Sequence, residues 1–424
     1  MKIVTDPLEN QLKQVGKSRI QADDPQVEAS VRQIIANVVT NGDQALREYE
    51  RQFDGVALEE FRIPDAQLTD ALAKISPELR EELDAASRNI TSFHQKELEN
   101  GFVDCEKDGV LRGQKILPIA RVGLYVPGGT ASYPSSVLMN AIPAKLAGVE
   151  RLVMVTPPQK DGIDQAVLAA AKLSGVDEVY QLGGAQAIAA LAYGTESVPR
   201  VDKIFGPGNI YVATAKKLVF GQVGIDMFAG PSEIGVIADQ SADATQVAAD
   251  LLSQAEHDPR ARPILATTSL EFAKDVSQAI DSQLESLPRQ EIARSSIENQ
   301  GFIAVLPQIK DLFALMNSLA PEHLEIQLPD PSSYLSQVKN AGSVFLGPYA
   351  SEPLGDYVAG PNHILPTSGT ARFSSPVGVY DFVKRTQFIQ YTKAALEKEA
   401  DYVTRLARTE GLEGHARAIE SRGS

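Results

Sequence analysis

A repeated rhythm of strand, turn and helix from about residue 118 onward constrains the fold more than any other feature of the sequence. Short apolar runs are each followed by glycine or proline and then by a segment with helical periodicity. Strands that alternate with helices form a parallel sheet covered by helices on both faces. We therefore predict an α/β protein with two series of strands, at residues 121–126, 152–156, 179–182 and 203–205, and at 234–238, 264–267, 303–306 and 342–346.

The length and charge of the chain narrow its class further. With 424 residues it should form two or three packed units, because domains usually run to about 100–200 residues. The net charge of −15 argues against nucleic acid or an anionic membrane surface as a partner, since both need a basic face. No apolar run reaches the ~18 residues of a membrane span, and no secretory signal is visible. The single cysteine fits a reducing compartment, so we expect a cytoplasmic protein.

Four of the five histidines lie after residue 250, each beside acidic or amide residues. Neutral imidazole is the commonest metal ligand in proteins and the usual proton shuttle near neutral pH. Gln254 and His257 are three positions apart at the end of a predicted helix, so their side chains share one face. Asp356 and His415 could complete a mixed set of nitrogen and oxygen ligands that suits zinc. Glutamine is an uncommon ligand, and the spacing taken alone favours an ordinary helix end over a metal site.

An acid and an imidazole stand side by side at Glu322 and His323. Adjacent groups of different pKa suit two-step proton chemistry, although a surface pair is the commoner arrangement. The stretch 355–363 is rich in loop-forming residues and still holds an acid, a tyrosine and a histidine. Loops of this kind carry sites more often than cores. Together these segments suggest one acid/base site assembled from distant parts of the chain.

Two glycine turns, residues 183–186 and 206–209, each join a predicted strand to the start of a helix. That geometry suits an anion or a phosphate, but no Gly-x-Gly-x-x-Gly fingerprint occurs. The sheet topology allows a dinucleotide site, and plain tight turns are the favoured interpretation of these residues alone. Cys105 lies between acidic residues, which disfavour a reactive thiolate, so any aldehyde oxidation must proceed without a cysteine.

A series of longer blocks, in order along nearly the whole chain, closely resembles the histidinol dehydrogenase family of the histidine-biosynthesis pathway. The blocks are RVGLYVPGG (121–129), LGGAQAIAA (182–190), GPGNIYVA (206–213), GIDMFAGPSEI (224–234), LSQAEHDP (252–259), PEHLE (321–325), GDY (355–357), NH (362–363) and GVYDFVK (378–384). The resemblance implies an oxidation of L-histidinol to L-histidine that uses water, two NAD⁺ and one zinc ion per subunit.

The resemblance also implies roles for individual residues. It implies a zinc site formed by Gln254, His257, Asp356 and His415. It implies an acid/base pair formed by Glu322 and His323. It implies substrate contacts from Ser232, Gln254, His257, His323, Asp356, His363, Glu410 and His415, and contacts to NAD from Tyr125, Gln186 and Asn209.

The family fold implies two incomplete Rossmann-like parallel-sheet domains, with helical extensions at both ends, in an intertwined homodimer with shared sites. We expect an N-terminal arm over residues 1–20 and a first domain over 21–124 and 234–377 that carries the metal and the substrate. The second domain, over 125–233, lies on the NAD side. The tail over 378–424 is helical but weakly amphipathic, so it should pack on a partner subunit and complete the partner's site.

Two alternatives compete with this interpretation. A sister dehydrogenase on the same scaffold would oxidise another small alcohol, such as a sulfonated diol, to its acid. Such a relative should replace the residues that recognise the amine and the imidazole of the substrate, whereas Glu410 and His415 are those expected for histidinol. A zinc hydrolase or a non-catalytic metal-binding protein is disfavoured by the paired βα series.

Overall fold

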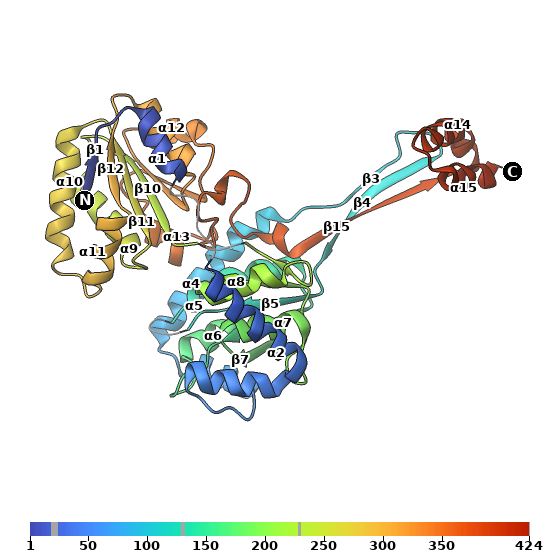
Figure 1. Cartoon of the computed structure of the whole chain (residues 1–424), viewed down its shortest axis with the longest axis horizontal. Helices are drawn as coiled ribbons and strands as arrows, with labels where there is room; N and C mark the ends of the chain where they lie inside the picture. Colours follow the sequence, from blue (N-terminus) through green and yellow to red (C-terminus); the bar gives the residue numbers. More distant parts are fainter. Residues whose placement is uncertain (18–23, 129–131, 228–229, 424) are drawn as a thin grey trace.

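The chain forms two α/β lobes and a long arm (Figure 1). The computed structural model describes residues 1–17, 24–128, 132–227 and 230–423. Each lobe is built on a six-stranded sheet, and the arm is built on a three-stranded sheet. The expected α/β class with parallel sheets is confirmed.

The first lobe, which we call the β10 lobe, has an all-parallel sheet in the order β1-β12-β11-β10-β13-β14. Its strands are β1 (Lys2–Val4), β10 (Glu233–Ala238), β11 (Arg262–Thr267), β12 (Phe302–Val305), β13 (His323–Gln327) and β14 (Ser343–Leu346). One apolar cluster packs beneath α9 (Ala244–Ala255), α10 (Leu270–Leu284) and α11 (Gln290–Asn299), and another beneath α1 (Leu8–Lys17) and α12 (Ile309–Leu319). Because both faces are covered, the central strands are apolar along their whole length instead of alternating.

The second lobe, which we call the β5 lobe, has the strand order β2-β7-β6-β5-β8-β9, and only β2 runs antiparallel to its neighbour. Its strands are β2 (Arg62–Ile63), β5 (Arg121–Tyr125), β6 (Arg151–Thr156), β7 (Glu178–Gln181), β8 (Lys203–Phe205) and β9 (Gly224–Ile225). Two apolar clusters again cover the two faces. The helices are α2 (Pro25–Tyr49), with the short π-helix η1 (Glu50–Asp54), α3 (Asp65–Lys74), α4 (Pro77–His94), α5 (Pro134–Ala147), α6 (Gln165–Leu173), α7 (Gly184–Tyr193) and α8 (Ile210–Val219).

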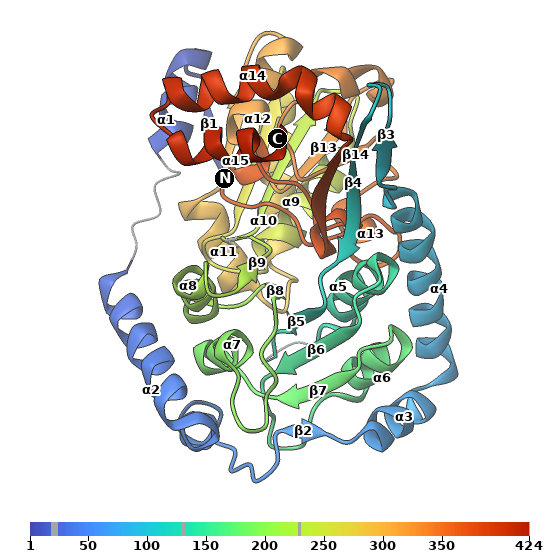
Figure 2. The same cartoon turned by 90° about the vertical axis from the view of Figure 1, so that its right-hand side faces the viewer.

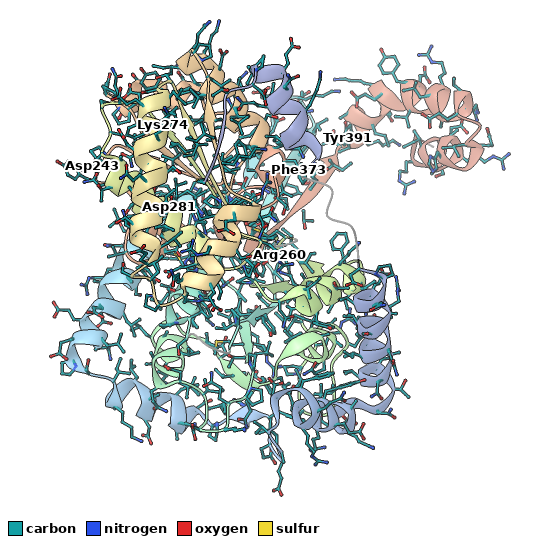
Figure 3. The ribbon with its side chains drawn as sticks, turned by 60° about the vertical axis from the view of Figure 1, so that its left-hand side comes forward. Asp243, Arg260, Lys274, Asp281, Phe373 and Tyr391 are labelled. Atoms are coloured by element: carbon teal, nitrogen blue, oxygen red, sulfur yellow. The ribbon has the colours of Figure 1, made fainter. Side chains whose placement is uncertain are left out.

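The arm is an antiparallel sheet that ends in two helices. Its elements are β3 (Phe102–Asp104), β4 (Val110–Pro118), β15 (Val383–Tyr391), α14 (Lys393–Thr409) and α15 (Glu413–Gly423). The two helices pack on each other at the tip, away from both lobes (Figure 1). In Figure 3, Tyr391 marks the arm where it stands clear of the body. Several large apolar side chains of the arm are exposed, namely Phe102, Val103, Ile389, Tyr391, Tyr402 and Leu406.

Several short elements lie within the β10 lobe or in the segments that connect the lobes and the arm. They are α13 (Glu352–Tyr357) and the 3-10 turns η2 (Gln95–Glu97), η3 (Pro331–Gln337), η4 (Thr370–Arg372) and η5 (Val379–Phe382). Phe382 of η5 stacks on Phe205 of β8 with ring centroids 4.1 Å apart, and both side chains are fully buried. This contact anchors the base of the arm in the β5 lobe.

The predicted domain boundaries are wrong at the N-terminal side. Residues 21–124 were expected to belong with 234–377, but the helices of this segment cover the β5 lobe (Figure 2). The apolar side chains of α2 pack with those of α7, and β2 adds an edge strand beside β7. The expected arm over 1–20 is part of the β10 lobe, because β1 pairs with β12 and α1 packs on α12. Residues 18–20 lie outside the described residues.

Gly42 breaks the long helix α2. Its backbone has φ +51°, a left-handed value that glycine adopts without steric strain, so two helical segments meet at a kink there. Residue 129 of the block 121–129 lies outside the described residues, as do residues 228–229 of the block 224–234. Among the described helices, none is long and apolar enough to cross a membrane.

Candidate active site

A cavity of about 830 Å³ lies between the two lobes. The β5 lobe lines it with residues of α4 and α5 and with the turn after β8. The β10 lobe lines it with the end of α9 and the start of β13, and α13 adds further residues. The cavity thus faces the carboxyl ends of the β5 lobe strands but the amino ends of β10 and β13. Its volume is typical of a site for a small molecule or cofactor.

Seven of the predicted site residues meet in this cavity. They come from four separate segments and are Ser232, Gln254, His257, Glu322, His323, Asp356 and His363. Residues far apart in the sequence therefore line one cavity, and their role as an acid/base site stays a prediction.

The backbone of Glu233 contacts both members of the acid/imidazole pair. Its N–H donates to Oε2 of Glu322 at 3.0 Å, and its carbonyl oxygen lies 3.3 Å from Nδ1 of His323. A carbonyl oxygen can only accept, so Nδ1 carries the proton and Nε2 of the neutral imidazole keeps its lone pair. The two side chains lie 3.7 Å apart, from Nδ1 to Oε2.

Burial shifts the pKa values of Glu322 and His323 in opposite directions. Loss of solvation raises the pKa of Glu322 well above its ordinary value, and the nearby carboxyls of Glu233 and Asp356 raise it further. Loss of solvation lowers the pKa of His323 to about 4. Burial therefore favours a protonated Glu322 and a neutral His323, which is the form of imidazole that can accept a proton.

Donors suited to a metal ion gather on one side of the cavity. The carbonyl oxygen of the Gln254 side chain, Oε1, is buried and has no hydrogen-bond partner among the described residues. His257 follows two positions after the end of α9 and is exposed to the cavity. One atom each from His323, Glu352 and Asp356 lie within 4.8 Å of one another.

Glu352 is a cavity residue that the sequence prediction missed. It is 2% exposed, and burial raises its pKa to about 8, helped by the neighbouring charge of Asp356. Its Oε2 accepts a hydrogen bond from Ser253 at 3.2 Å. The spacing of Glu352 and Asp356, four positions apart on α13, places both acids on one helix face and could have indicated this pair.

His363 links the two lobes. Its Nδ1 lies 3.0 Å from the carbonyl oxygen of Asp356, and its Nε2 lies 3.2 Å from the hydroxyl of Ser136 on α5. Burial lowers the pKa of His363, so the imidazole is neutral and accepts from the serine. Ser136 also lines the cavity and was not predicted.

Two predicted site residues lie far from the cavity within this chain. Glu410 ends α14 and His415 lies on α15, and both are exposed at the tip of the arm. Neither lines the cavity formed by the described residues. The predicted zinc set is thus divided, with three members at the cavity and His415 on the arm.

The three residues predicted to contact NAD lie at the carboxyl ends of β5, β7 and β8. The hydroxyl oxygen of Tyr125 accepts from Gly184 N–H at 3.2 Å, and burial raises the pKa of this hydroxyl. Gln186 is buried on α7, and Asn209 caps α8 by accepting from two backbone N–H groups. They do not line the cavity themselves, but the turn residues 206–208 beside Asn209 do.

Comparison with known proteins places the chain in one family. A family model described as histidinol dehydrogenase matches residues 17–423. The histidinol dehydrogenase of Lactiplantibacillus plantarum is 65% identical over 422 residues, covering 100% of this chain and 99% of the relative. That of Listeria monocytogenes serovar 1/2a is 58% identical, with the same coverage. The chain belongs to the histidinol dehydrogenase family.

The fold agrees with this membership. The crystal structure of histidinol dehydrogenase from Elizabethkingia anophelis is 38% identical to this chain and superposes with a TM-score of 0.93, covering 100% of this chain and 98% of that one. As a member of the histidinol dehydrogenase family, the protein is an NAD-dependent oxidoreductase of histidine biosynthesis.

The buried His323 should make this protein less stable in acid. Above about pH 6.5 the imidazole is neutral in both the folded and the unfolded chain and contributes nothing. As the pH falls toward 4, the unfolded chain takes up a proton that the folded chain resists, so the free energy of unfolding decreases. Relative to His323→Asn, the parent should lose about 2 kcal/mol more between pH 7 and pH 4.5, measured by urea unfolding of chelator-treated protein.

The control is Gln246→Leu on α9, an exposed substitution that changes no titrating group. It should follow the pH dependence of the parent. Equal acid sensitivity of the parent and His323→Asn would contradict a depressed pKa for His323.

Proposed function

We propose that the protein oxidises L-histidinol to L-histidine through histidinaldehyde, as the last step of histidine biosynthesis. The balanced reaction is L-histidinol + 2 NAD⁺ + H₂O → L-histidine + 2 NADH + 3 H⁺. The observation that carries the proposal is the buried pair of Glu322 and neutral His323 in a cavity that also gathers donors for a metal ion. Oxidation of an alcohol to an acid needs two proton acceptors in one place, and this pair supplies them once Glu322 is ionised.

One zinc ion per subunit is part of the proposal. Gln254, His257 and Asp356 would hold it from one chain, and His415 would hold it from a second copy of the chain. The buried, unpartnered Oε1 of Gln254 supports this assignment, since a buried polar atom without a partner is costly. The set of nitrogen and oxygen donors suits zinc. When bound, zinc would be chelated by the amine and imidazole nitrogens of histidinol, and this would orient the substrate.

The first oxidation uses His323. Its Nε2 has a free lone pair because Nδ1 is held by the carbonyl of Glu233. It accepts the proton of the alcohol while NAD⁺ takes the hydride from the carbinol carbon. The depressed pKa of His323 keeps the imidazole ready to accept at neutral pH.

The second oxidation uses Glu322 and water. The raised pKa of Glu322 makes its carboxylate a strong base once ionised, and it accepts a proton from the water that attacks the aldehyde. A second hydride then leaves from the hydrate to a second NAD⁺. Cys105 is exposed on the arm and does not line the cavity, which supports a route through water instead of a thiol. Enclosure between the lobes would retain the reactive aldehyde.

The remaining substrate and NAD contacts are assigned from the positions of the residues in the fold. We assign Ser232 and His363 to the substrate, because both line the cavity. Tyr125, Gln186 and Asn209 are assigned to NAD, since the carboxyl ends of parallel strands are where such sheets bind dinucleotides. Glu410 and His415 are assigned to the substrate of a second copy.

A homodimer with shared sites explains the arm. The arm extends away from both lobes and exposes large apolar side chains that a lone chain has no reason to present (Figure 1). An element that reaches away from its own body in this manner is suited to two-fold exchange. We propose that each arm crosses to a partner and brings Glu410 and His415 to the partner's cavity.

Metal removal tests the zinc proposal. Chelation should abolish turnover of histidinol, and added zinc should restore it. Gln254→Leu removes one ligand and should lower the affinity for zinc by about tenfold or more. The purified variant should therefore contain less zinc than the parent, measured by elemental analysis. The exposed Gln246→Leu on the same helix is the control and should keep its zinc. Full activity in a preparation shown to be free of metal would rule the proposal out.

The variant Glu322→Gln tests the proposed reaction and separates its two steps. With limiting histidinol the parent should form two NADH per histidinol, measured by absorbance. The variant keeps the shape of the side chain but removes the base, so oxidation of added histidinaldehyde should fall by about 10²–10⁴-fold, and alcohol oxidation far less.

Glu178→Gln serves as the control, because Glu178 is a buried glutamate on β7 that does not line the cavity. Both steps should keep their parental rates in this control. If Glu322→Gln oxidised the aldehyde at the parental rate, Glu322 would not be the base for water.

Complementation tests the shared site. His323→Ala and His415→Ala should each be nearly inactive alone. In a mixed dimer, one site takes His323 from one chain and His415 from the other and is intact. Random pairing makes about half the dimers mixed, so roughly a quarter of the parental sites should return on co-expression.

The pair His415→Ala and Glu410→Ala is the matched control. Both lesions lie on the arm, so every site in their mixed dimer carries one of them. This pair should not complement. Mixed dimers of His323→Ala and His415→Ala with no more activity than either variant alone would exclude sharing.

A further inference from the structure

Glu50 is a fully buried acid with no part in the proposed chemistry. It begins the π-helix η1, directly after α2, and its exposed fraction is 0%. A π-helical turn is rare in proteins and recurs at functional sites. A buried carboxyl is costly unless it is neutral or well paired, so its place in the β5 lobe calls for a specific role.

The carboxyl of Glu50 reaches across to the turn that follows β7. Its Oε1 accepts from the backbone N–H of Gly183 at 3.2 Å and from Nε2 of Gln186 at 3.0 Å. The next backbone N–H, of Gly184, donates to the hydroxyl of Tyr125 at 3.2 Å. One acid therefore fixes both the backbone of the turn and the side chain of Gln186, beside Tyr125.

The Gln186 side chain is packed closely against the backbone of this turn. Gly184 has φ +60°, and a Cβ at this position would lie 2.6 Å from Oε1 of Gln186. The carboxamide is therefore folded tightly against the backbone of its own helix start. Oε1 of Gln186 is buried and has no hydrogen-bond partner among the described residues. The hydrogen bond from Nε2 of Gln186 to Oε1 of Glu50 therefore anchors the carboxamide.

Glu50 is favoured in its neutral form, in which it can still accept hydrogen bonds. Burial, together with the neighbouring charge of Asp54, raises the pKa of Glu50 to about 8. The pKa of Asp54 is raised as well, also by burial. A neutral carboxyl accepts both hydrogen bonds without adding a buried negative charge beside a site proposed for a phosphate-containing cofactor.

We propose that Glu50 is a positioning residue for the dinucleotide: its carboxyl holds the Gly183 amide and the Gln186 carboxamide in the arrangement that the cofactor meets. This inference rests on the proposed function, because Gln186 and Tyr125 are assigned to NAD there. Glu50 acts through Gln186 and the turn and does not itself touch the cofactor.

Two substitutions of Glu50 distinguish the effect of its hydrogen-bond acceptor from the effect of its side-chain size. Glu50→Gln keeps the shape, the neutrality and an acceptor oxygen, whereas Glu50→Met keeps the length but leaves Gly183 N–H and Gln186 Nε2 without a partner. Glu50→Met should raise the KM for NAD⁺ and the Kd for NADH, measured by fluorescence, by about tenfold. Its kcat and its KM for histidinol should stay within about twofold of the parent, and Glu50→Gln should resemble the parent in every value.

The matched control is Asp43→Asn on α2. Asp43 is also buried and accepts hydrogen bonds from Ser197, but it does not contact the turn at Gly183. This variant should lose stability and keep the parental Kd for NADH. If Glu50→Met fails to fold, Glu50→Ala, which also lacks the acceptor, replaces it in the same comparison.

Three results would overturn the role of Glu50 alone: an unchanged Kd in Glu50→Met, an equal loss in Glu50→Gln, or an equal loss in Asp43→Asn. A parent protein that bound no NADH would instead overturn the proposed function, and the role of Glu50 with it.

Discussion

The backbone of Glu233 holds the acid and the imidazole of the cavity at the same time. Its N–H binds Glu322 and its carbonyl contacts His323, because β10 and β13 pair in parallel with Ile234 opposite His323. The backbone hydrogen bonds between these two packed strands fix their register, so the pairing holds these groups more firmly than a loop would. The tautomer of His323, the position of Glu322 and the orientation of both toward the cavity all depend on this one strand pairing.

Around that pair the cavity concentrates carboxyls. Burial raises the pKa values of Glu322 and Glu352, which both line the cavity, and the nearby Asp356 adds to the effect for both. Several acids in one enclosed space are stable only if some are protonated or if cations join them. The proposed substrate carries an ammonium group and the proposed metal is a divalent cation. The local excess of acid is therefore complementary to the ligands that we propose, while the net charge of −15 on the whole chain has no such account.

The two lobes contribute different chemistry to the same cavity. The β10 lobe presents the amino ends of its strands, with the acid, the imidazole and the metal donors. The β5 lobe presents the carboxyl ends of its strands, with the turns that suit a dinucleotide. His363 and Ser136 bridge the lobes by a hydrogen bond, and Phe382 fixes the base of the arm to the β5 lobe. The sites that we propose for the substrate and for NAD therefore belong mainly to different lobes.

The residue pattern by itself determined the α/β class, the two strand series and the kinds of side chain that the cavity gathers. The class and the strand series follow from local periodicity. The choice of Glu322, His323 and Gln254 needed the family resemblance as well, because their chemistry and spacing alone favoured ordinary structural positions. Only the tertiary structure decided which sheet the N-terminal helices cover, because the apolar stripe of α2 would fit either lobe. It also brought Glu352 into the cavity and separated His415 from it. Those outcomes depend on packing between segments far apart in the chain, which local periodicity does not encode.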